Sequence, residues 1–169
     1  MEKLVLIDGH SILNRAFYGV PNLTNSEGLH TNAVYGFLNI LFKVLDEEKA
    51  DYLAVAFDLK APTFRHKMFD AYKGTRKPMP EELHEQVPLM KEVLTAMGVP
   101  ILTKEGYEAD DILGTIAKRE QKDGYEVTIL SGDRDLLQLS DTHIRICLPK
   151  TSRGTTEVHN YYPEDVIRE

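Results

Sequence analysis

Short, uninterrupted runs of apolar residues recur along this chain, separated by longer segments in which apolar residues have helical spacing. The runs at 4–7, 53–57 and 127–130 do not alternate with polar residues, which is typical of strands buried on both faces of a parallel sheet. The expected elements are a strand over 3–8, a helix over 31–47, a strand over 52–57, a helix over 81–97, a strand over 99–103, a helix over 108–123, a strand over 126–131, a helix over 133–139 and a strand over 143–148.

The helical segments are marked by apolar residues three or four positions apart and by residues that begin or end helices. The apolar face of the first helix consists of Val34, Phe37, Leu38, Leu41 and Leu45. Pro80 marks the start of the next helix, and Gly98 and Gly124 mark helix ends. Strands that alternate with helices predict a three-layer α/β domain with a mainly parallel central sheet.

Two connections are longer than a minimal domain of this class needs. We expect residues 10–30 to form an ordered loop with a short helical start, and residues 60–80 to form an irregular or helical basic segment. Long connections in compact domains are usually functional or disordered. Residues 162–169 resemble the start of a helix at which the sequence stops, so we expect this chain to be a fragment of a longer protein.

The composition is that of one globular domain. The chain has 169 residues, of which 42% are hydrophobic, and no apolar run approaches the roughly 20 residues that span a bilayer. The N-terminus has no signal-peptide pattern and Cys147 is the single cysteine, so we expect a cytoplasmic protein without a membrane partner. The neighbours of Cys147 form a strand pattern, which predicts core packing rather than catalysis.

Acidic residues follow the ends of the predicted strands. In open α/β sheets ligands bind beyond the carboxyl ends of the strands. We therefore expect seven carboxylates at one edge of the sheet: Asp8, Asp58, Glu108, Asp110, Asp111, Asp133 and Asp135. Such a cluster of oxygen ligands favours Mg²⁺ or Mn²⁺ over zinc. The number of carboxylates is sufficient for two ions of the kind that promote phosphoryl chemistry.

Helix capping and turn formation are alternative roles for each of these aspartates. Glu108 and Asp111 are three residues apart and share a helix face, whereas Asp110 points elsewhere unless Glu108 precedes the regular helix. The helix dipole favours acids at this position without any metal, so capping stays open for one of the three. Asp133 can likewise cap the helix that follows it.

Basic and aromatic residues interleave between positions 64 and 77. They are Phe64, Arg65, His66, Lys67, Tyr72, Lys73, Arg76 and Lys77. This mixture suits single-stranded nucleic acid, in which bases stack on rings and cations meet phosphates; a solvated cationic loop is the alternative. The net charge of −7 does not exclude nucleic acid, because many of the acids belong to the predicted metal cluster.

Two residues near the first aspartate have open roles. Arg15 follows Asp8 closely enough to reach a bound phosphate, and a structural salt bridge explains it about as well. His10 is either a ring on which a base stacks or a turn residue.

Five motifs, taken in order, resemble the 5′-nuclease domain, a flap endonuclease-like domain at the N-terminus of bacterial DNA polymerase I. They are Leu6-Ile7-Asp8-Gly9-His10-Ser11, Ala56-Phe57-Asp58, the segment from Tyr72 to Pro80, Glu108-Ala109-Asp110-Asp111 and Ser131-Gly132-Asp133-Arg134-Asp135. The likeness covers essentially the whole sequence. It implies a PIN-like fold with a helical arch at about 60–97, and metal-dependent removal of 5′ flaps, 5′ ends and RNA primers in replication and repair.

The resemblance also implies roles for individual residues and partners. The first metal ion would be held by Asp8, Asp58, Glu108 and Asp110, and the second site would include Asp111, Asp133 and Asp135. Lys73 and Arg76 would contact the scissile phosphate, Tyr72 would stack on a terminal base, and Lys77 would contact DNA beside them. The implied partners are DNA with a 5′ flap or 5′ end and a polymerase domain in the same full-length chain.

The sequence departs from the family at its end. Family members continue into a helix–hairpin–helix-like module, preceded by aspartates that complete the second metal site, and this sequence stops before both. We therefore expect a weaker second site and low cleavage. Two other hypotheses are a catalytically impaired DNA-binding fragment and a phosphatase with Asp8 as nucleophile, although position 10, where such a phosphatase usually has a second acid, holds His10.

Overall fold

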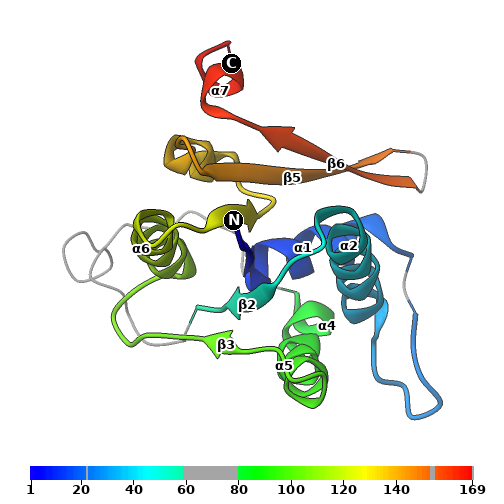
Figure 1. The fold of residues 1–169 in the computed structure, drawn as a ribbon. Coiled ribbons are helices and arrows are strands. Elements are labelled where there is room, and N and C mark those ends of the chain that lie inside the picture. Colours follow the sequence, from blue (N-terminus) through cyan, green and yellow to red (C-terminus); the bar gives the residue numbers. More distant parts are fainter. Residues whose placement is uncertain (22, 59–79, 153–154, 169) are drawn as a thin grey trace.

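A central sheet of six strands forms the middle layer of the domain (Figure 1). The computed structural model describes residues 1–21, 23–58, 80–152 and 155–168. The strands are β1 (Lys3–Asp8), β2 (Tyr52–Ala56), β3 (Ile101–Leu102), β4 (Glu126–Leu130), β5 (Ile144–Ser152) and β6 (Thr155–Tyr161). Their order across the sheet is β3-β2-β1-β4-β5-β6, and all neighbours are parallel except β5 and β6, which are antiparallel.

Helices cover both faces of this sheet. They are α1 (Gly9–Gly19), α2 (Asn32–Glu48), α4 (Glu81–His84), α5 (Gln86–Ala96), α6 (Ala109–Lys122), the 3-10 helix η1 (Arg134–Leu139) and the terminal α7 (Pro163–Arg168). Helices α1, α2 and α5 lie on one side, and α6 lies on the other (Figure 1). The predicted three-layer α/β class with a mainly parallel sheet is therefore confirmed.

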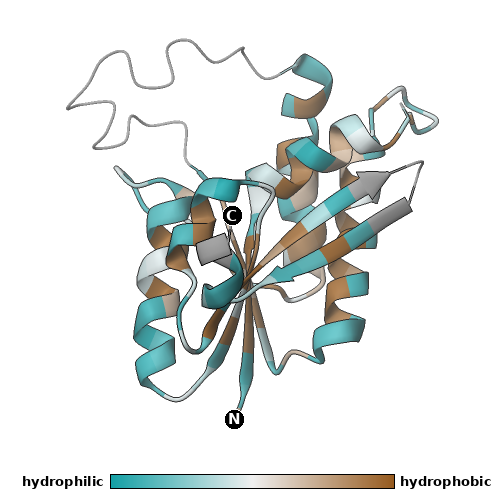
Figure 2. Ribbon diagram, turned by 90° about the horizontal axis from the view of Figure 1, so that it is seen from above, coloured by the Kyte–Doolittle hydropathy of each residue, from teal (hydrophilic) through white to brown (hydrophobic). Residues whose placement is uncertain are grey.

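The strands divide the core into two halves because successive side chains point to opposite faces. Val5 and Ile7 of β1 pack with α1, α2 and α5, whereas Leu4 and Leu6 pack with α6 and η1. Figure 2 shows these apolar positions gathered where the helices face the sheet. Full burial of each such aliphatic side chain stabilises the fold by about 1.5–3 kcal/mol.

Two glycines allow close approach beside the carboxyl end of β1. A Cβ atom on Gly9 would lie 2.5 Å from the Phe57 ring, and one on Gly36 would lie 2.7 Å from Cβ of Ala16. Because Gly9 has no side chain, the start of α1 can pack against the Phe57 ring, which directly follows β2. Because Gly36 has none, α2 can pack closely on α1. The ends of β1 and β2 are thereby fixed next to each other.

For residues 10–30 the predicted helical start is present but longer than expected, since it forms the regular helix α1 over Gly9–Gly19. The buried residues Ile12, Leu13 and Ala16 have helical spacing, but Pro21 and the polar residues after it led to the interpretation as a loop. The expected helix over 81–97 is divided at Glu85 into α4 and α5. Pro88 explains the division, since its ring is incompatible with an ordinary helical carbonyl four residues earlier.

The edges of the sheet also differ from the prediction. Strand β3 is shorter than the expected 99–103, β5 continues beyond 148, and β6 was missed. The segment expected as a helix over 133–139 is the 3-10 helix η1. Antiparallel β6 pairs on one side with β5, so its mixed polar sequence lacks the apolar run that marks the central strands.

Cys147 lies on β5 in the core, as predicted, and its burial raises the pKa of its thiol to about 12. Within the described ranges, no helix has the length and apolar character that crossing a membrane requires. Of the segment at about 60–97 that we predicted to form a helical arch, the structure describes residues 80–97, which include α4 and α5, and residues 59–79 lie outside the described residues.

Candidate active site

The carboxyl ends of β2, β1 and β4 meet at one edge of the sheet, because these three strands are parallel neighbours. Asp8 is the last residue of β1, and Asp58 lies two residues beyond β2. Ser131 follows β4 directly and leads into Asp133 at the start of η1. The sequence prediction of acids at a common edge agrees with this topology.

Asp8 is a strongly perturbed carboxyl group at this edge. It is buried, its Oδ1 accepts the Ser11 N–H at 3.4 Å as the N-cap of α1, and its Oδ2 accepts the Ser131 hydroxyl at 3.1 Å. Burial above all, and then the charge of Asp110, raise the pKa of Asp8 from 3.8 to about 7; Asp58 adds to the rise, and the two hydrogen bonds oppose it. The negative charges of Asp110 and Asp58 therefore both act on Asp8.

Asp58 joins β2 to the start of α6. Its Oδ1 accepts the N–H of Ala109 at 2.6 Å, and its own N–H donates to Nδ1 of His10 at 3.1 Å. His10 Nδ1 also lies 3.7 Å from Asp58 Oδ2, and the His10 ring meets the Phe57 ring edge-on with centroids 5.3 Å apart. His10 therefore sits against the end of β2, beside a candidate ligand.

The first turn of α6 brings three more acids to this edge. Glu108 is the N-cap and is buried, with its Oε1 atom shielded from solvent. Asp111 turns back, and its Oδ2 accepts the Glu108 N–H at 3.0 Å. Glu108 and Asp111 form a reciprocal capping box, so two of the three acids cap α6, and Asp110 acts electrostatically on Asp8.

The turn after β4 contributes the last two acids. Asp133 is half-buried and caps η1, since its Oδ1 accepts the Asp135 N–H at 2.9 Å. Asp135 is exposed in the first turn of η1. Asp133 is connected to Asp8 through Ser131, whose hydroxyl accepts the Asp133 N–H at 3.0 Å. The hydroxyls of Ser11 and Ser131 were missed in the sequence, where small polar residues beside turns carry no distinctive signal.

Two basic side chains lie near the acids in the described part of the chain. A Cβ atom on Gly132 would lie 3.2 Å from Arg15 Nε, which places the Arg15 side chain against the turn that follows β4. Lys91 of α5 has its Nζ 5.2 Å from the centroid of the Phe57 ring, one residue before Asp58. Arg15 was a predicted site residue and Lys91 was not, because on sequence it is an ordinary polar position of a helix. Tyr72, Lys73, Arg76 and Lys77 lie outside the described residues.

The carboxylate oxygens of these acids are suitable ligands for a hard divalent cation, but their side chains are not oriented as they would be around a bound ion. Over residues 1–21, 23–58, 80–152 and 155–168, no group of three or more His, Cys, Asp or Glu side chains is arranged as a metal site. Asp58, Asp111 and Asp133 accept backbone N–H groups instead. All the donors are carboxylate oxygens, and their mutual repulsion is the condition that a bound cation relieves.

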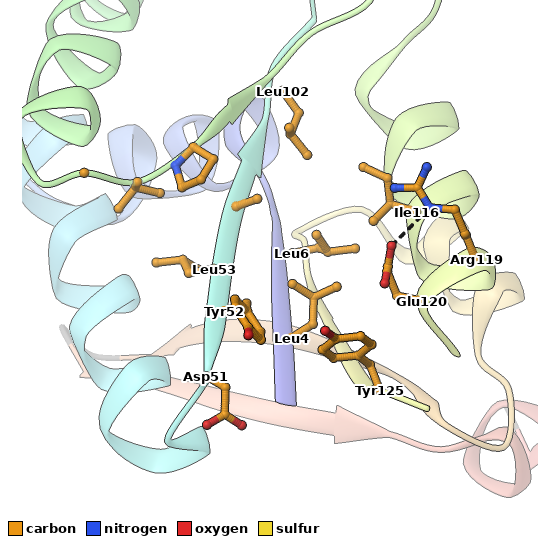
Figure 3. A pocket seen from close by; sticks show the side chains of 14 residues that line it. Leu4, Leu6, Asp51, Tyr52, Leu53, Leu102, Ile116, Arg119, Glu120 and Tyr125 are labelled. Carbon is orange, nitrogen blue, oxygen red and sulfur yellow. Dashed lines mark hydrogen bonds and ion pairs between the residues drawn. The ribbon is translucent and has the colours of Figure 1, made fainter. Parts of the chain in front are cut away.

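A groove of about 560 Å³ lies elsewhere, between α6 and the strands β1, β2 and β3 (Figure 3). Leu4, Leu6, Leu102 and Ile116 supply much of its apolar lining, and the Arg119–Glu120 ion pair lies at one side (Figure 3). None of the seven acids lines it. The groove is thus separate from the candidate active site.

The sequence matches, over residues 3–169, the family model described as "5'-3' exonuclease, N-terminal resolvase-like domain". It is 50% identical over 165 residues to a DNA polymerase I of Bacillus caldotenax, covering 98% of this chain and 19% of the relative. The corresponding protein of Bacillus subtilis is 49% identical, over 98% of this chain and 18% of the relative. The chain thus spans about a fifth of the length of these curated relatives.

Solved structures share the fold. The T5 5'-exonuclease with bound divalent zinc ions superposes with a TM-score of 0.73 at 23% identity, over 99% of this chain and 60% of that one. The T5 D15 flap endonuclease in a pseudo-enzyme-product complex with DNA and metal ions gives 0.72 at 22% identity, over 99% and 60%. These similarities show that this chain shares the fold of the two T5 proteins over nearly its whole length.

Proposed function

Because the chain belongs to the family of 5′-3′ exonuclease N-terminal resolvase-like domains, we propose that it is the nuclease portion of a DNA polymerase I and hydrolyses phosphodiesters at DNA 5′ ends and 5′ flaps. Support comes from relatives about half identical in sequence that are named DNA polymerase I. The observation that carries the proposal is the convergence of acids at the carboxyl edge of the sheet, where Asp8 ends β1 and the Asp58 carboxylate accepts the Ala109 N–H at the start of α6, next to Asp110.

We propose that this edge holds divalent cations, Mg²⁺ or Mn²⁺. Asp8, Asp58, Glu108 and Asp110 would hold one ion, and Asp111, Asp133 and Asp135 would lie in or beside a second site. When bound, such ions neutralise the carboxylates, activate water and stabilise charge that develops on phosphate oxygens. The capping carboxylates, among them Asp58, would turn from a backbone N–H toward the ion, so binding involves small side-chain rotations at helix starts.

The remaining residues of the site would orient the substrate. Arg15 lies against the turn after β4, where its guanidinium would meet a phosphate of the bound strand. Lys73 and Arg76 would hold the scissile phosphate, and Tyr72 and Lys77 would contact the strand beside it; the support for these four is the family motif. Their positive charge would offset the charge of the phosphates against an acidic edge.

Cleavage of a 5′-labelled flap duplex tests the proposal, with Mg²⁺, with Mn²⁺ and with a chelator. Asp58→Asn is the sharpest variant, because the amide oxygen still accepts the Ala109 N–H while the negative charge is lost. We expect metal-dependent cutting that falls at least about 100-fold in the variant. The control Asp46→Asn makes the same change at an exposed position of α2 and should cut normally.

The same experiment separates cleavage from binding alone. Flap-duplex affinity is measured in Ca²⁺ by anisotropy before the cleavage assay. Tight binding without any cutting in Mg²⁺ or Mn²⁺ would favour the impaired DNA-binding fragment, and release of phosphate from a monoester with no cutting of the duplex would favour the phosphatase.

A further inference from the structure

Ser131 occupies a distinctive place between the two groups of acids. Its side chain is fully buried, and its Oγ atom lies 3.1 Å from Asp8 Oδ2, 3.3 Å from Ser11 Oγ and 3.0 Å from the Asp133 backbone nitrogen. Its own N–H donates to the Cys147 carbonyl oxygen on β5 at 3.1 Å. One hydroxyl group thus touches a residue on β1, a residue on α1 and the turn that enters η1.

The hydrogens of this cluster can be assigned from its partners, because a hydroxyl group has one hydrogen to donate and two lone pairs that accept. Ser131 has one hydrogen and gives it to Asp8 Oδ2, so the 3.3 Å contact between the two hydroxyl groups takes its hydrogen from Ser11, whose Oγ accepts the Gly132 N–H at 2.6 Å. Ser131 Oγ then accepts from Ser11 and from the Asp133 N–H, and donates to the carboxylate of Asp8. With Ser11 donating to Ser131 and Ser131 donating to Asp8, each of the two hydroxyl groups gives its hydrogen to an acceptor.

This hydrogen-bond chain begins where the backbone connection between the two strands ends. The paired residues of β1 and β4 run from Lys3 and Glu126 to Ile7 and Leu130. Asp8 and Ser131 are the next residues on each strand, and a side-chain hydrogen bond joins them instead. Beyond this point the turn with Asp133 and Asp135 is connected to Asp8 through these hydroxyls.

We propose that Ser131, supported by Ser11, is a positioning residue that fixes the Asp8 carboxylate relative to the Asp133 turn, so that the acids on β1 and after β4 bind divalent cations as one site. The inference rests on the proposed function, in which these acids hold the cations. Ser131 contacts no reacting atom; it acts by limiting the orientations of one carboxylate and of one turn. Residues that orient ligands in this way typically contribute 10- to 100-fold in metal affinity.

The test measures Mn²⁺ binding to the full chain by calorimetry and by electron paramagnetic resonance, with thermal unfolding as a check on folding. Ser131→Ala is expected to weaken Mn²⁺ binding at least about tenfold. Ser131→Thr keeps the hydroxyl group and should bind within about threefold of wild type. Ser140→Ala, at the far end of η1, is the matched control and should bind as wild type does.

Ser11→Ala gives an independent measurement, since it removes one link and leaves Ser131 in place. We expect a smaller loss, and a double Ser11→Ala, Ser131→Ala variant no weaker than Ser131→Ala alone, because Ser11 acts through Ser131. If Ser131→Ala does not fold, the Mn²⁺ affinity of Ser11→Ala tests the inference in its place.

Three outcomes would overturn the inference. One is a folded Ser131→Ala with Mn²⁺ affinity within twofold of wild type, or, if that variant does not fold, Ser11→Ala within twofold. Another is an equal loss in the alanine and threonine variants, which would mean that shape rather than the hydroxyl group matters. A wild-type chain that binds no Mn²⁺ would overturn the proposed function and this inference with it, whereas the first two outcomes leave the proposed function standing.

Discussion

Burial, neighbouring charges and hydrogen bonds all affect the pKa of Asp8, and they do not all act in the same direction. Burial disfavours its charge, Asp110 and Asp58 disfavour it further, and the Ser11 N–H and the Ser131 hydroxyl favour it. The pKa of Asp8 rises to about 7 as a result. A carboxylate that is held in place and whose charge is disfavoured is stabilised by a positive partner, so the same features that destabilise the cation-free domain favour binding of a cation.

The stability of the cation-free domain should therefore depend on pH through Asp8. Because the pKa of Asp8 is about 7 in the folded chain and 3.8 in the reference state, the folded chain binds more protons between these values and loses stability as the pH rises through them. Asp8→Asn removes the charge and should stabilise the domain above pH 7 by about 1–3 kcal/mol, below the limit of about 4 kcal/mol that the shift implies.

The gain from Asp8→Asn should become small as the pH falls to 4 and disappear at about pH 3, where the carboxyl group is protonated in both states. Urea unfolding in the presence of a chelator, across this pH range, measures it. Asp46→Asn, at an exposed position, is the control and should show little pH-dependent gain. A stabilisation by Asp8→Asn that stays constant from pH 4 to 8 would contradict the account.

Individual acids could be predicted because each follows an apolar run, and the parallel sheet then brings them together. Their partners could not. Ser11 and Ser131 meet across 120 positions of sequence, and nothing in a serine near a turn indicates which carboxylate it will contact. Asp111 shows the same limit, since its capping role depends on which way one side chain turns.

The start of α2 depends on a residue from another helix. Its N-cap, Thr31, makes no side-chain capping bond. Gln86 of α5, fully buried, accepts the N–H groups of Ala33 and Val34 at 2.8 and 3.2 Å with its Oε1 atom. Its Nε2 atom donates to Asn32 Oδ1 at 2.9 Å. The side-chain amide of Gln86 thus caps the N-terminal end of α2 and links this helix to α5.

Gln86→Leu should therefore destabilise the domain by about 2–4 kcal/mol, because two helix N–H groups lose their acceptor in a buried place. Chemical denaturation measures the loss. Gln138→Leu makes the same change at an exposed position of η1 and should cost less than about 0.5 kcal/mol. Similar losses in the two variants would show that the amide has no special role.

Elements with apolar periodicity were predicted and elements defined by tertiary contacts were not. Strands β1, β2 and β4 and helices α2 and α6 lie within a few residues of their expected limits. Helix α1 is longer than the predicted helical start, because Pro21 and the polar residues after it favoured a loop, and β6 has a polar sequence that forms a strand by pairing with β5. The division between α4 and α5 follows from Pro88, whose effect the continuous apolar spacing concealed.

At the scale of the whole molecule, Arg145 connects the layer of α2 to the sheet and to the C-terminal segment. Its guanidinium pairs with the buried carboxylate of Glu48 at the end of α2 and donates to Thr128 Oγ1 at 3.0 Å. It also donates to the Tyr162 hydroxyl at 3.2 Å. Removal of Arg145 would leave a buried negative charge without this partner.

We expect Arg145→Met to cost about 3–5 kcal/mol, and Arg145→Met combined with Glu48→Leu to cost much less than the sum of the single changes. Urea denaturation of the four proteins completes the double-mutant cycle. Additive losses would mean that the two side chains stabilise the fold independently.

The whole domain should also distinguish a binding cation from general screening of its charge. The chain has a net charge of −7, and NaCl weakens repulsion among its exposed groups but acts little on a buried carboxylate such as Asp8. An ion that binds the folded state stabilises it by about 2.7 kcal/mol at 100 times its dissociation constant. Saturating Mn²⁺ should therefore raise the melting temperature by roughly 5–10 °C.

NaCl at the same ionic strength should change the melting temperature far less, and a chelator should reverse the effect of Mn²⁺. Asp58→Asn should lose most of the Mn²⁺-dependent shift, because one charge of the proposed site is gone while the cap on Ala109 is kept. Scanning calorimetry of both proteins in the three solutions makes the comparison. If NaCl and Mn²⁺ shifted the melting temperature equally, the acidic edge would be responding to screening alone, and the carboxylates would be helix caps that happen to meet at the end of a parallel sheet.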